Sequence, residues 1–214
     1  PDILEASSLA SKLAALPSVH SVLTIRTEDA DFERDGTSAD EGAILGVGTG
    51  APPPWTILRG RDLQTDHELV LNQYAARTLH AEPGTTVTVR ATCARGSEAP
   101  PSIVFRVVGI AELPFETLDE PAAGTTATSL SDACGTPQAD LADFLAVTST
   151  GDPDATAAAI AAISPGLRIF TNEQAIGQLQ QGGFTYFRQI STVLTTITVS
   201  FALLLITVLL TVSV

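Results

Sequence analysis

The two cysteines, Cys93 and Cys134, are the side chains of this sequence with the most definite chemistry. Both stand in loop-like stretches of small and polar residues, and an even number of cysteines is compatible with one disulfide bond. Such a bond is stable in an oxidising compartment. We predict that the two cysteines are bridged, and a pair of unrelated free thiols is the alternative.

A second group of side chains resembles a calcium site. Acidic residues alternate from Asp31 to Asp35, and Gly36 takes the sixth position, as in the loop of an EF-hand. The closing glutamate of such a loop stands twelfth, but that position is Gly42, and no pair of helices is predicted on either side. We therefore favour a solvated acidic loop over residues 28–41, and calcium binding there stays open.

Other patterns typical of enzymes are incomplete. The glycines of residues 46–50 are followed by prolines and not by the Gly-Lys-Ser/Thr of a phosphate-binding loop. His20, His67 and His80 have no zinc-like spacing, and the sequence has no Gly-x-Ser-x-Gly nucleophile elbow. We therefore expect no catalytic residue, no cofactor-binding site and no metal site in this chain, and we do not expect it to be an enzyme.

The net negative charge of the chain argues against anionic binding partners. Acidic residues outnumber basic residues by 24 to 11, the net charge is −13, and Lys12 is the single lysine. Nucleic acids and the anionic inner leaflet of a membrane attract clustered positive charge, so neither is an expected partner. The acidity and the predicted disulfide both favour a location outside the cytoplasm.

The C-terminal stretch has the character of a membrane helix. No charged residue occurs after Arg188, and residues 190–214 form an apolar run that, at about 25 residues, is long enough to cross a bilayer core of about 30 Å. A long buried helix of a soluble protein is the alternative. The chain begins with Pro1 and contains no methionine, so we expect it to be an internal segment of a longer protein.

Hydrophobic periodicity and turn residues predict the elements that position these groups. Strands are expected over residues 19–27, 43–47, 68–72, 85–91, 102–113, 144–148 and 167–170. Helices are expected over residues 3–16, 73–80 and 155–163, and a long loop over 114–141. A final helix is expected to begin at Asn172, with the pair Gly182 and Gly183 as a hinge before the membrane.

This order predicts an α+β fold, in which a mixed α/β sheet layer is backed by helices and carries an inserted, mostly β lobe. The predicted parts are a discontinuous α+β subdomain, the inserted lobe with its long loop, a stalk helix and a transmembrane helix. Their bounds are residues 1–54 with 142–171, 55–141, 172–189 and 190–214, respectively.

Four phrases occur in a fixed order along the middle of the chain. They are Leu58-Arg-Gly-Arg-Asp-Leu63, Glu68-Leu-Val-Leu-Asn-Gln-Tyr-Ala-Ala-Arg-Thr-Leu79, Pro83-Gly-Thr-Thr-Val-Thr-Val89 and Phe105-Arg-Val-Val-Gly-Ile110. In order and spacing they resemble the MacB-like periplasmic core domain of the MacB/FtsX superfamily of ABC-transporter permeases. The resemblance covers residues 43–113. It implies that the α+β subdomain is similar to the porter subdomain of the family. It also implies that Gly60, Arg61, Gly84 and Gly109 are the turn residues of the family motifs. Residues 28–41 and 114–141 match no family pattern.

The resemblance implies an FtsX-like permease subunit in the plasma membrane, multi-pass, with this domain outside the cytoplasm. A cytoplasmic ABC ATPase would bind ATP and Mg²⁺, and a second permease copy or a paralogue would complete a dimer. Such permeases couple ATP hydrolysis to substrate export or to extracytoplasmic mechanical work (mechanotransmission), in some cases on an extracytoplasmic protein partner. A ligand-binding or sensing ectodomain of a membrane receptor is the first alternative, and a membrane-anchored extracellular enzyme is the second.

Overall fold

A computed structural model describes residues 3–94, 100–114, 117, 119–136, 140–174 and 177. Contacts between residues divide the chain into two units, Pro1–Gly151 and Asp152–Val214. The first unit contains all the described strands. Of the second unit, the structure describes the helix α4 (Pro153–Ile163), which Asp152 caps by accepting a hydrogen bond from the Asp154 amide.

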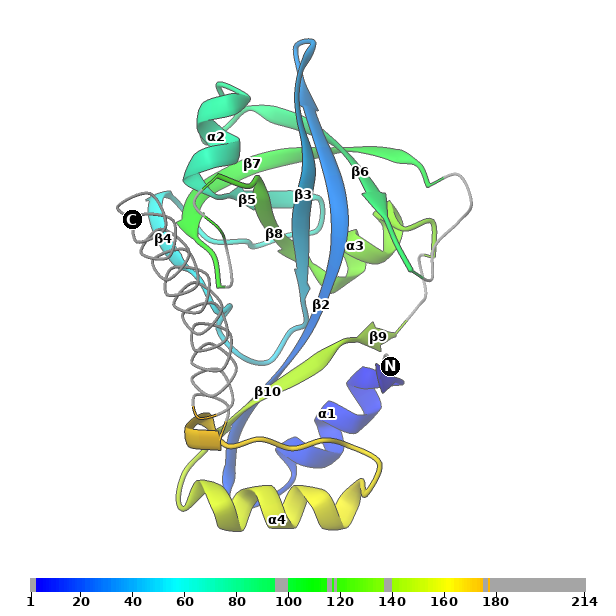
Figure 1. The fold of residues 1–214 in the computed structure, drawn as a ribbon, viewed down its shortest axis with the longest axis vertical. Helices are drawn as coiled ribbons and strands as arrows, with labels where there is room; N and C mark the ends of the chain where they lie inside the picture. Colours follow the sequence, from blue (N-terminus) through cyan, green and yellow to red (C-terminus); the bar gives the residue numbers. More distant parts are fainter. Residues whose placement is uncertain are drawn as a thin grey trace, which may run out of the picture. The chain divides into compact units, whose positions relative to one another are not determined.

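The first unit is an eight-stranded mixed sheet with three short helices and a separate two-stranded ladder (Figure 1). The strands are β1 (Ile3–Leu4), β2 (Val19–Arg34), β3 (Thr37–Val47), β4 (Thr56–Gly60), β5 (Glu68–Leu71), β6 (Thr86–Thr92), β7 (Ser102–Glu112), β8 (Ala122–Thr126), β9 (Leu141–Ala142) and β10 (Phe144–Ser149). The helices are α1 (Ala6–Ala14), α2 (Gln73–Thr78) and α3 (Ala127–Ala133). The predicted α+β class is confirmed.

Strand pairing closes part of the sheet into a ring. The strand order is β10-β2-β3-β8-β5-β7-β4, and β6 pairs with both β2 and β7. The strands β2, β3, β8, β5, β7 and β6 therefore form a closed circuit of hydrogen-bonded neighbours. The long β2 makes this possible because it pairs with β10 over residues 19–25 and with β6 over residues 29–33.

The core follows from this ring. One cluster of buried side chains comes from all six ring strands together with α2 and α3, and includes Phe32, Leu71, Val89, Phe105 and Leu130. A second cluster gathers around Trp55. Gly124 makes room for that indole, because a Cβ at this position would lie 2.5 Å from the Trp55 ring.

Four sequence predictions about elements are wrong. Residues 28–41 are not a loop: they belong to the β2–β3 hairpin, whose two-residue turn at Asp35 and Gly36 has positive φ at both positions. Ala30 and Phe32 are buried while the acidic residues beside them face outward, and the burial of these two side chains stabilises the strand even in this acidic stretch. Residues 3–16 begin with β1, and the helix starts only at Ala6.

The other two errors concern small residues and isolated apolar runs. Residues 114–141 contain β8 and α3, and β8 is formed by small side chains that fit between β3 and β5. Residues 167–170 form no strand in the described part of the second unit, since no neighbouring strand pairs with them there. The division of the chain at residues 54/55 and 141/142 stays a prediction.

Candidate functional site

The four motif residues lie together around β7. Gly60 and Gly109 face each other in the β4–β7 ladder, and both need to be glycine because a side chain at either would collide with a carbonyl oxygen, that of Val108 or Arg61. Gly60 also has φ +81°, a conformation that favours glycine. Gly84 has φ +104°, and its amide donates to the Val107 carbonyl at 2.7 Å.

Arg61 of this cluster binds Glu68 at the start of β5. Its Nη1 donates to Glu68 Oε2 at 2.8 Å, and Nη2 donates to Oε1. The Glu68 carboxylate also accepts from the amide of Gln64 at 2.8 Å and from that of Thr65 at 3.2 Å. The hydrogen bond from Arg61 and these amides outweigh burial and lower the pKa of Glu68 to about 2. The same hydrogen bond raises the pKa of Arg61.

These contacts assign the motif residues a structural role in the described fold. Gly60 and Gly109 bring β4 close to β7, Arg61 and Glu68 close the connection from β4 to β5, and Gly84 starts β6 against β7. Sequence analysis did not single out Glu68, although a lone acidic residue at the head of the buried run Leu69–Leu71 is an available signal for a charge that requires a partner.

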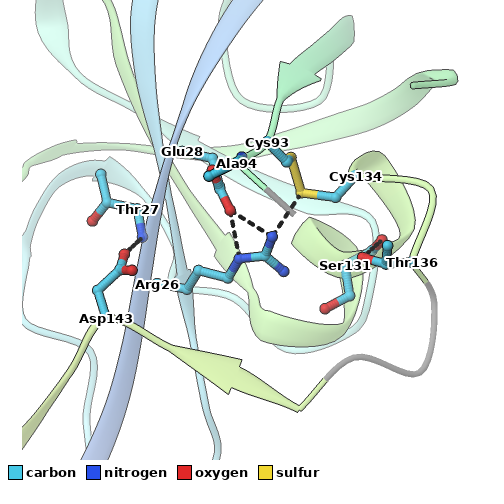
Figure 2. The surroundings of a disulfide bond; sticks show 9 residues. All are labelled: Arg26, Thr27, Glu28, Cys93, Ala94, Ser131, Cys134, Thr136 and Asp143. Atoms are coloured by element: carbon cyan, nitrogen blue, oxygen red, sulfur yellow. Dashed lines mark hydrogen bonds and ion pairs between the residues drawn. A yellow bond between two sulfur atoms is a disulfide. The ribbon is translucent and has the colours of Figure 1, made fainter. Parts of the chain in front are cut away.

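The cysteines form a second cluster. Cys93 follows β6 and Cys134 follows α3, and the structure joins them by a disulfide with Cα atoms 5.6 Å apart. Figure 2 shows the Arg26 guanidinium between this bond and Glu28. Arg26 Nε donates to Glu28 Oε1 at 2.7 Å, Nη2 lies 2.5 Å from the same oxygen, and Nη2 also donates to Cys134 Sγ at 3.4 Å.

Burial makes these polar contacts significant. The Arg26 side chain is 5% exposed and that of Glu28 is 10% exposed. Within the described part of the chain, Arg26 Nη1 is buried and has no hydrogen-bond partner. The other oxygen of Glu28 accepts from the Ala94 amide at 3.2 Å, so Glu28 links Arg26 to the residue that follows Cys93. Sequence analysis did not identify Arg26 or Glu28 because nothing local relates them to the cysteines.

The described residues contain one group of potential metal ligands. Atoms of Glu28, Cys93 and Cys134 lie within 4.8 Å of one another. With the cysteines joined and Arg26 bound to the carboxylate, this group lacks free thiolates and already holds a cation. The carboxylates of Asp31, Glu33 and Asp35 are not gathered in this way in the described structure: they follow one another along a strand and its turn, so the EF-hand geometry is absent.

The other positions weighed in the sequence, which were not expected to form a site, lie apart from one another. His67 contacts Asp132, with 3.5 Å between Nε2 and Oδ2, and lies beside Phe105, whereas the carbonyl of His80 accepts from Arg34. Residues 46–47 end β3 and pair with β8 instead of forming a phosphate loop. Gly182, Gly183 and the predicted stalk lie outside the described residues. No helix among the described residues is long and apolar enough to cross a membrane, and the predicted span at 190–214 also lies outside them.

A groove of about 500 Å³ lies between α2 and β4. Leu58, Ala76 and Ile110 contribute apolar surface, and Arg59 and Arg77 contribute positive charge. Arg59 is already paired with Glu82 at 3.1 Å. The lining also includes His80 and Glu82, and as a whole it suits a small amphipathic group.

Comparison with known proteins bears on the fold. No protein-family model and no curated protein matches the chain. Among solved structures, the periplasmic region of MacB from Actinobacillus actinomycetemcomitans matches with a TM-score of 0.60, covering 85% of this chain and 84% of that one at 14% identity. The chain has the fold of this MacB region.

A second solved structure has the same fold. The extracellular domain of the noncanonic ABC-type transporter YknZ from Gram-positive bacteria matches with a TM-score of 0.56 at 13% identity, covering 76% of this chain and 82% of that one. The resemblance in the four sequence phrases is therefore confirmed at the level of fold. In this MacB-like fold the phrases correspond to β4 with its turn, β5 with α2, β6 and β7.

Proposed function

We propose that this chain is the extracytoplasmic domain of an ABC-transporter permease, which couples ATP hydrolysis on a cytoplasmic ATPase to export or to mechanical work outside the membrane. The observation that carries the proposal is the MacB-like fold over 85% of the chain. Two solved domains with this fold belong to proteins named as MacB and as an ABC-type transporter, and both are described as periplasmic or extracellular.

Two features of the molecule support a position outside the cytoplasm. The disulfide between Cys93 and Cys134 is of a kind that persists in oxidising compartments. The net charge of −13 suits a domain that stays clear of anionic lipid and nucleic acid. The apolar run at residues 190–214 supplies the proposed membrane attachment.

The sheet offers a physical route for transmitting motion within the first unit. β2 has 16 residues and is continuous from its pairing with β10 to its pairing with β6. A strand of this length extends over about 50 Å, and it resists stretching because a β-strand is already close to the full extension of the chain. In the proposed mechanism, displacement at the β10 end reaches the β6 end through this strand.

The partners follow from the proposal. ATP and Mg²⁺ belong to the ATPase, which is a separate subunit or a fused domain, and a second permease copy or a paralogue completes the dimer. This chain would contribute no catalytic residue and hold no cofactor. An extracytoplasmic protein partner is included in the proposal, and the groove between α2 and β4 is one surface available to it.

The test is purification of the intact parent protein in mild detergent, followed by an ATPase assay on the complex. We expect an ATPase subunit or domain to be recovered, with turnover that changes when a flexible linker is inserted after Leu179, in the predicted stalk. The matched control is the same linker after Gly50, an exposed glycine in the connection from β3 to β4, which should leave turnover unchanged. A well-folded parent with no ATPase would refute the proposal and favour a receptor ectodomain.

A further inference from the structure

The disulfide has an arginine directed at only one of its sulfur atoms. Arg26 Nη2 donates to Cys134 Sγ at 3.4 Å, and Cys134 is fully buried, whereas Cys93 is partly buried between the exposed residues Thr92 and Ala94 (Figure 2). The two sulfur atoms are therefore chemically different. One is more accessible, and the other lies beside a buried positive charge.

This difference has a consequence for thiol–disulfide exchange. In that reaction a thiolate attacks one sulfur and the other leaves as a thiolate, and the reaction is faster when the leaving thiolate is more stable. A neighbouring arginine stabilises a thiolate, and it does so more strongly when water is excluded. Arg26 is 5% exposed, so its charge acts on Cys134 with little screening by solvent.

The free donor of Arg26 strengthens the argument. Within the described residues, Nη1 is buried without a partner, and an unsatisfied buried donor is unfavourable. A neutral disulfide sulfur is a weak acceptor, whereas a thiolate carries a full charge and accepts a stronger hydrogen bond from Nη2. Cleavage of the bond would thus turn a weak acceptor of the guanidinium into a strong one.

We propose that Cys93–Cys134 is a thiol-exchange site, in which Cys93 is the sulfur attacked and Arg26 holds Cys134 as the leaving thiolate. The co-reactant is a thiol, from a small molecule or from a dithiol protein. Its thiolate sulfur bonds to Cys93 Sγ, the electron pair of the disulfide passes to Cys134 Sγ, and a mixed disulfide on Cys93 results. A second thiolate, from the same dithiol protein or from another molecule of the small thiol, then attacks the co-reactant sulfur and releases Cys93, which takes up a proton from solvent. The protein thereby gains two electrons, and the co-reactant is oxidised to a disulfide.

Glu28 moderates this effect. Its carboxylate binds Nε and Nη2 of Arg26 and so offsets the charge that faces Cys134. Removal of the Glu28 charge should therefore make exchange faster, and removal of the Arg26 charge should make it slower. A metal site in the reduced form is the competing use of Glu28, Cys93 and Cys134, but the guanidinium bound to Glu28 opposes a second cation there.

Reduction of the disulfide would remove the covalent link between the ends of β6 and α3. Residues 26–28 of β2 lie between the part that pairs with β10 and the part that pairs with β6. The disulfide holds the end of β6 and the end of α3 at this point. The thiol-exchange site would therefore control how firmly β6 and α3 are fastened to each other. This inference stands apart from the transporter proposal, because it depends only on contacts within the first unit.

The first experiment uses the unmodified full chain in mild detergent with reduced glutathione as the probe. After short exposure at pH 8, the reaction is quenched with acid, free thiols are alkylated, and peptides are identified by mass spectrometry. We expect glutathione on Cys93 and the alkyl group on Cys134. Glutathione mainly on Cys134, or equally on both, would overturn the assignment, as would a bond that glutathione does not open in the folded chain.

The second experiment compares rates of reduction in variants. We expect Arg26→Gln to be about ten-fold slower than the unmodified chain and Glu28→Gln to be several-fold faster, with Arg26→Lys in between. The matched controls are Arg59→Gln and Glu82→Gln, the same changes in an exposed ion pair, which should leave the rate unchanged. If the two charge variants change the rate of reduction in opposite directions, the effect is electrostatic. A local destabilisation of the fold around the disulfide would instead accelerate reduction in both variants. Acceleration in both, or no change in either, would overturn the proposal.

Discussion

Removal of the disulfide should cost the first unit about 4 kcal/mol of unfolding free energy. The two cysteines are 41 residues apart in the sequence. A cross-link that closes a loop of this length lowers the entropy of the unfolded chain by about 13 cal/mol/K, which is about 4 kcal/mol at 25 °C. We expect Cys93→Ala/Cys134→Ala to lose this amount, together with a smaller contribution from the cavity left by the buried sulfur of Cys134.

The single tryptophan provides the assay. Trp55 is buried in the second core cluster and donates to Asp62 Oδ1 at 3.0 Å, so its fluorescence reports whether that cluster is intact. Urea titrations of the full chain in mild detergent would compare the unmodified and double-alanine forms. With a slope of about 2 kcal/mol/M, the loss moves the midpoint down by about 2 M. The slope itself should rise, because the unfolded chain expands once the cross-link is gone.

A single variant separates the two contributions. Cys93→Ala breaks the bond but keeps the buried sulfur of Cys134, so it should lose nearly as much stability as the double variant. If the double variant lost less than about 1.5 kcal/mol, the loop-entropy argument would be refuted for this protein. If Cys93→Ala lost little while Cys134→Ala lost much, packing of the sulfur would be the dominant effect.

Three further predictions use the same titration. The pKa of Glu68 in the fold is about 2, below its ordinary 4.5, so the charged carboxylate stabilises the fold above pH 4.5 and this contribution is lost as the pH falls toward 2. The difference in urea midpoint between the unmodified chain and Glu68→Gln should therefore shrink over that pH range. A difference that stayed constant would contradict the effect. Gly109→Ala should lower the free energy of unfolding by about 1–3 kcal/mol, because the new Cβ collides with the Arg61 carbonyl. The control is Gly151→Ala, which should lower it little because the structure places nothing within 4 Å of that Cβ. Equal losses in the two variants would contradict the steric argument. Asn72→Ala should lose about 1–2 kcal/mol with the cap of α2, and an unchanged midpoint would show that the cap is dispensable.

The elements with strong local signals were predicted well. The apolar run at residues 68–71, Asn72 and the following helix occur as β5, the N-cap and α2, and β7 closely matches the predicted strand at 102–113. In each case the hydrophobic pattern and the turn or cap residue favour the same structure. Pairing partners could not be predicted, because β5 pairs with β7 and β8, which come much later in the chain.

The β2–β3 hairpin shows how composition can mislead. Asp35-Gly36 is one of the residue pairs typical of a two-residue hairpin turn, and Arg34 and Thr37 pair across it. The alternation of Ala30 and Phe32 with acidic residues also predicts a strand. The acidic character of the segment led instead to a loop with a resemblance to a calcium site, so local turn chemistry was the better guide.

The cysteine pair could be anticipated from the count and the surroundings of the cysteines, but the groups around it could not. Arg26 lies 108 residues from Cys134, and only the pairing of β2 with β6 and the packing of α3 bring them together. The same limit applies to β8, whose small residues are buried because Trp55, β3 and β5 surround them and not because they are strongly apolar.

The partner change along β2 explains why charged residues gather at one buried place. Between its ladders with β10 and β6, β2 has backbone groups that no strand of the described structure pairs with on that side. Asp143, just before β10, accepts from the Thr27 amide at 2.7 Å, and Glu28 accepts from Ala94, just after β6 (Figure 2). Arg26 then balances the charge of Glu28 and reaches the disulfide. A strand that pairs with two successive partners leaves unpaired backbone groups between them, and polar side chains gather there. In this protein two of those side chains, Arg26 and Glu28, also determine which sulfur of the disulfide is the better leaving group in the proposed exchange.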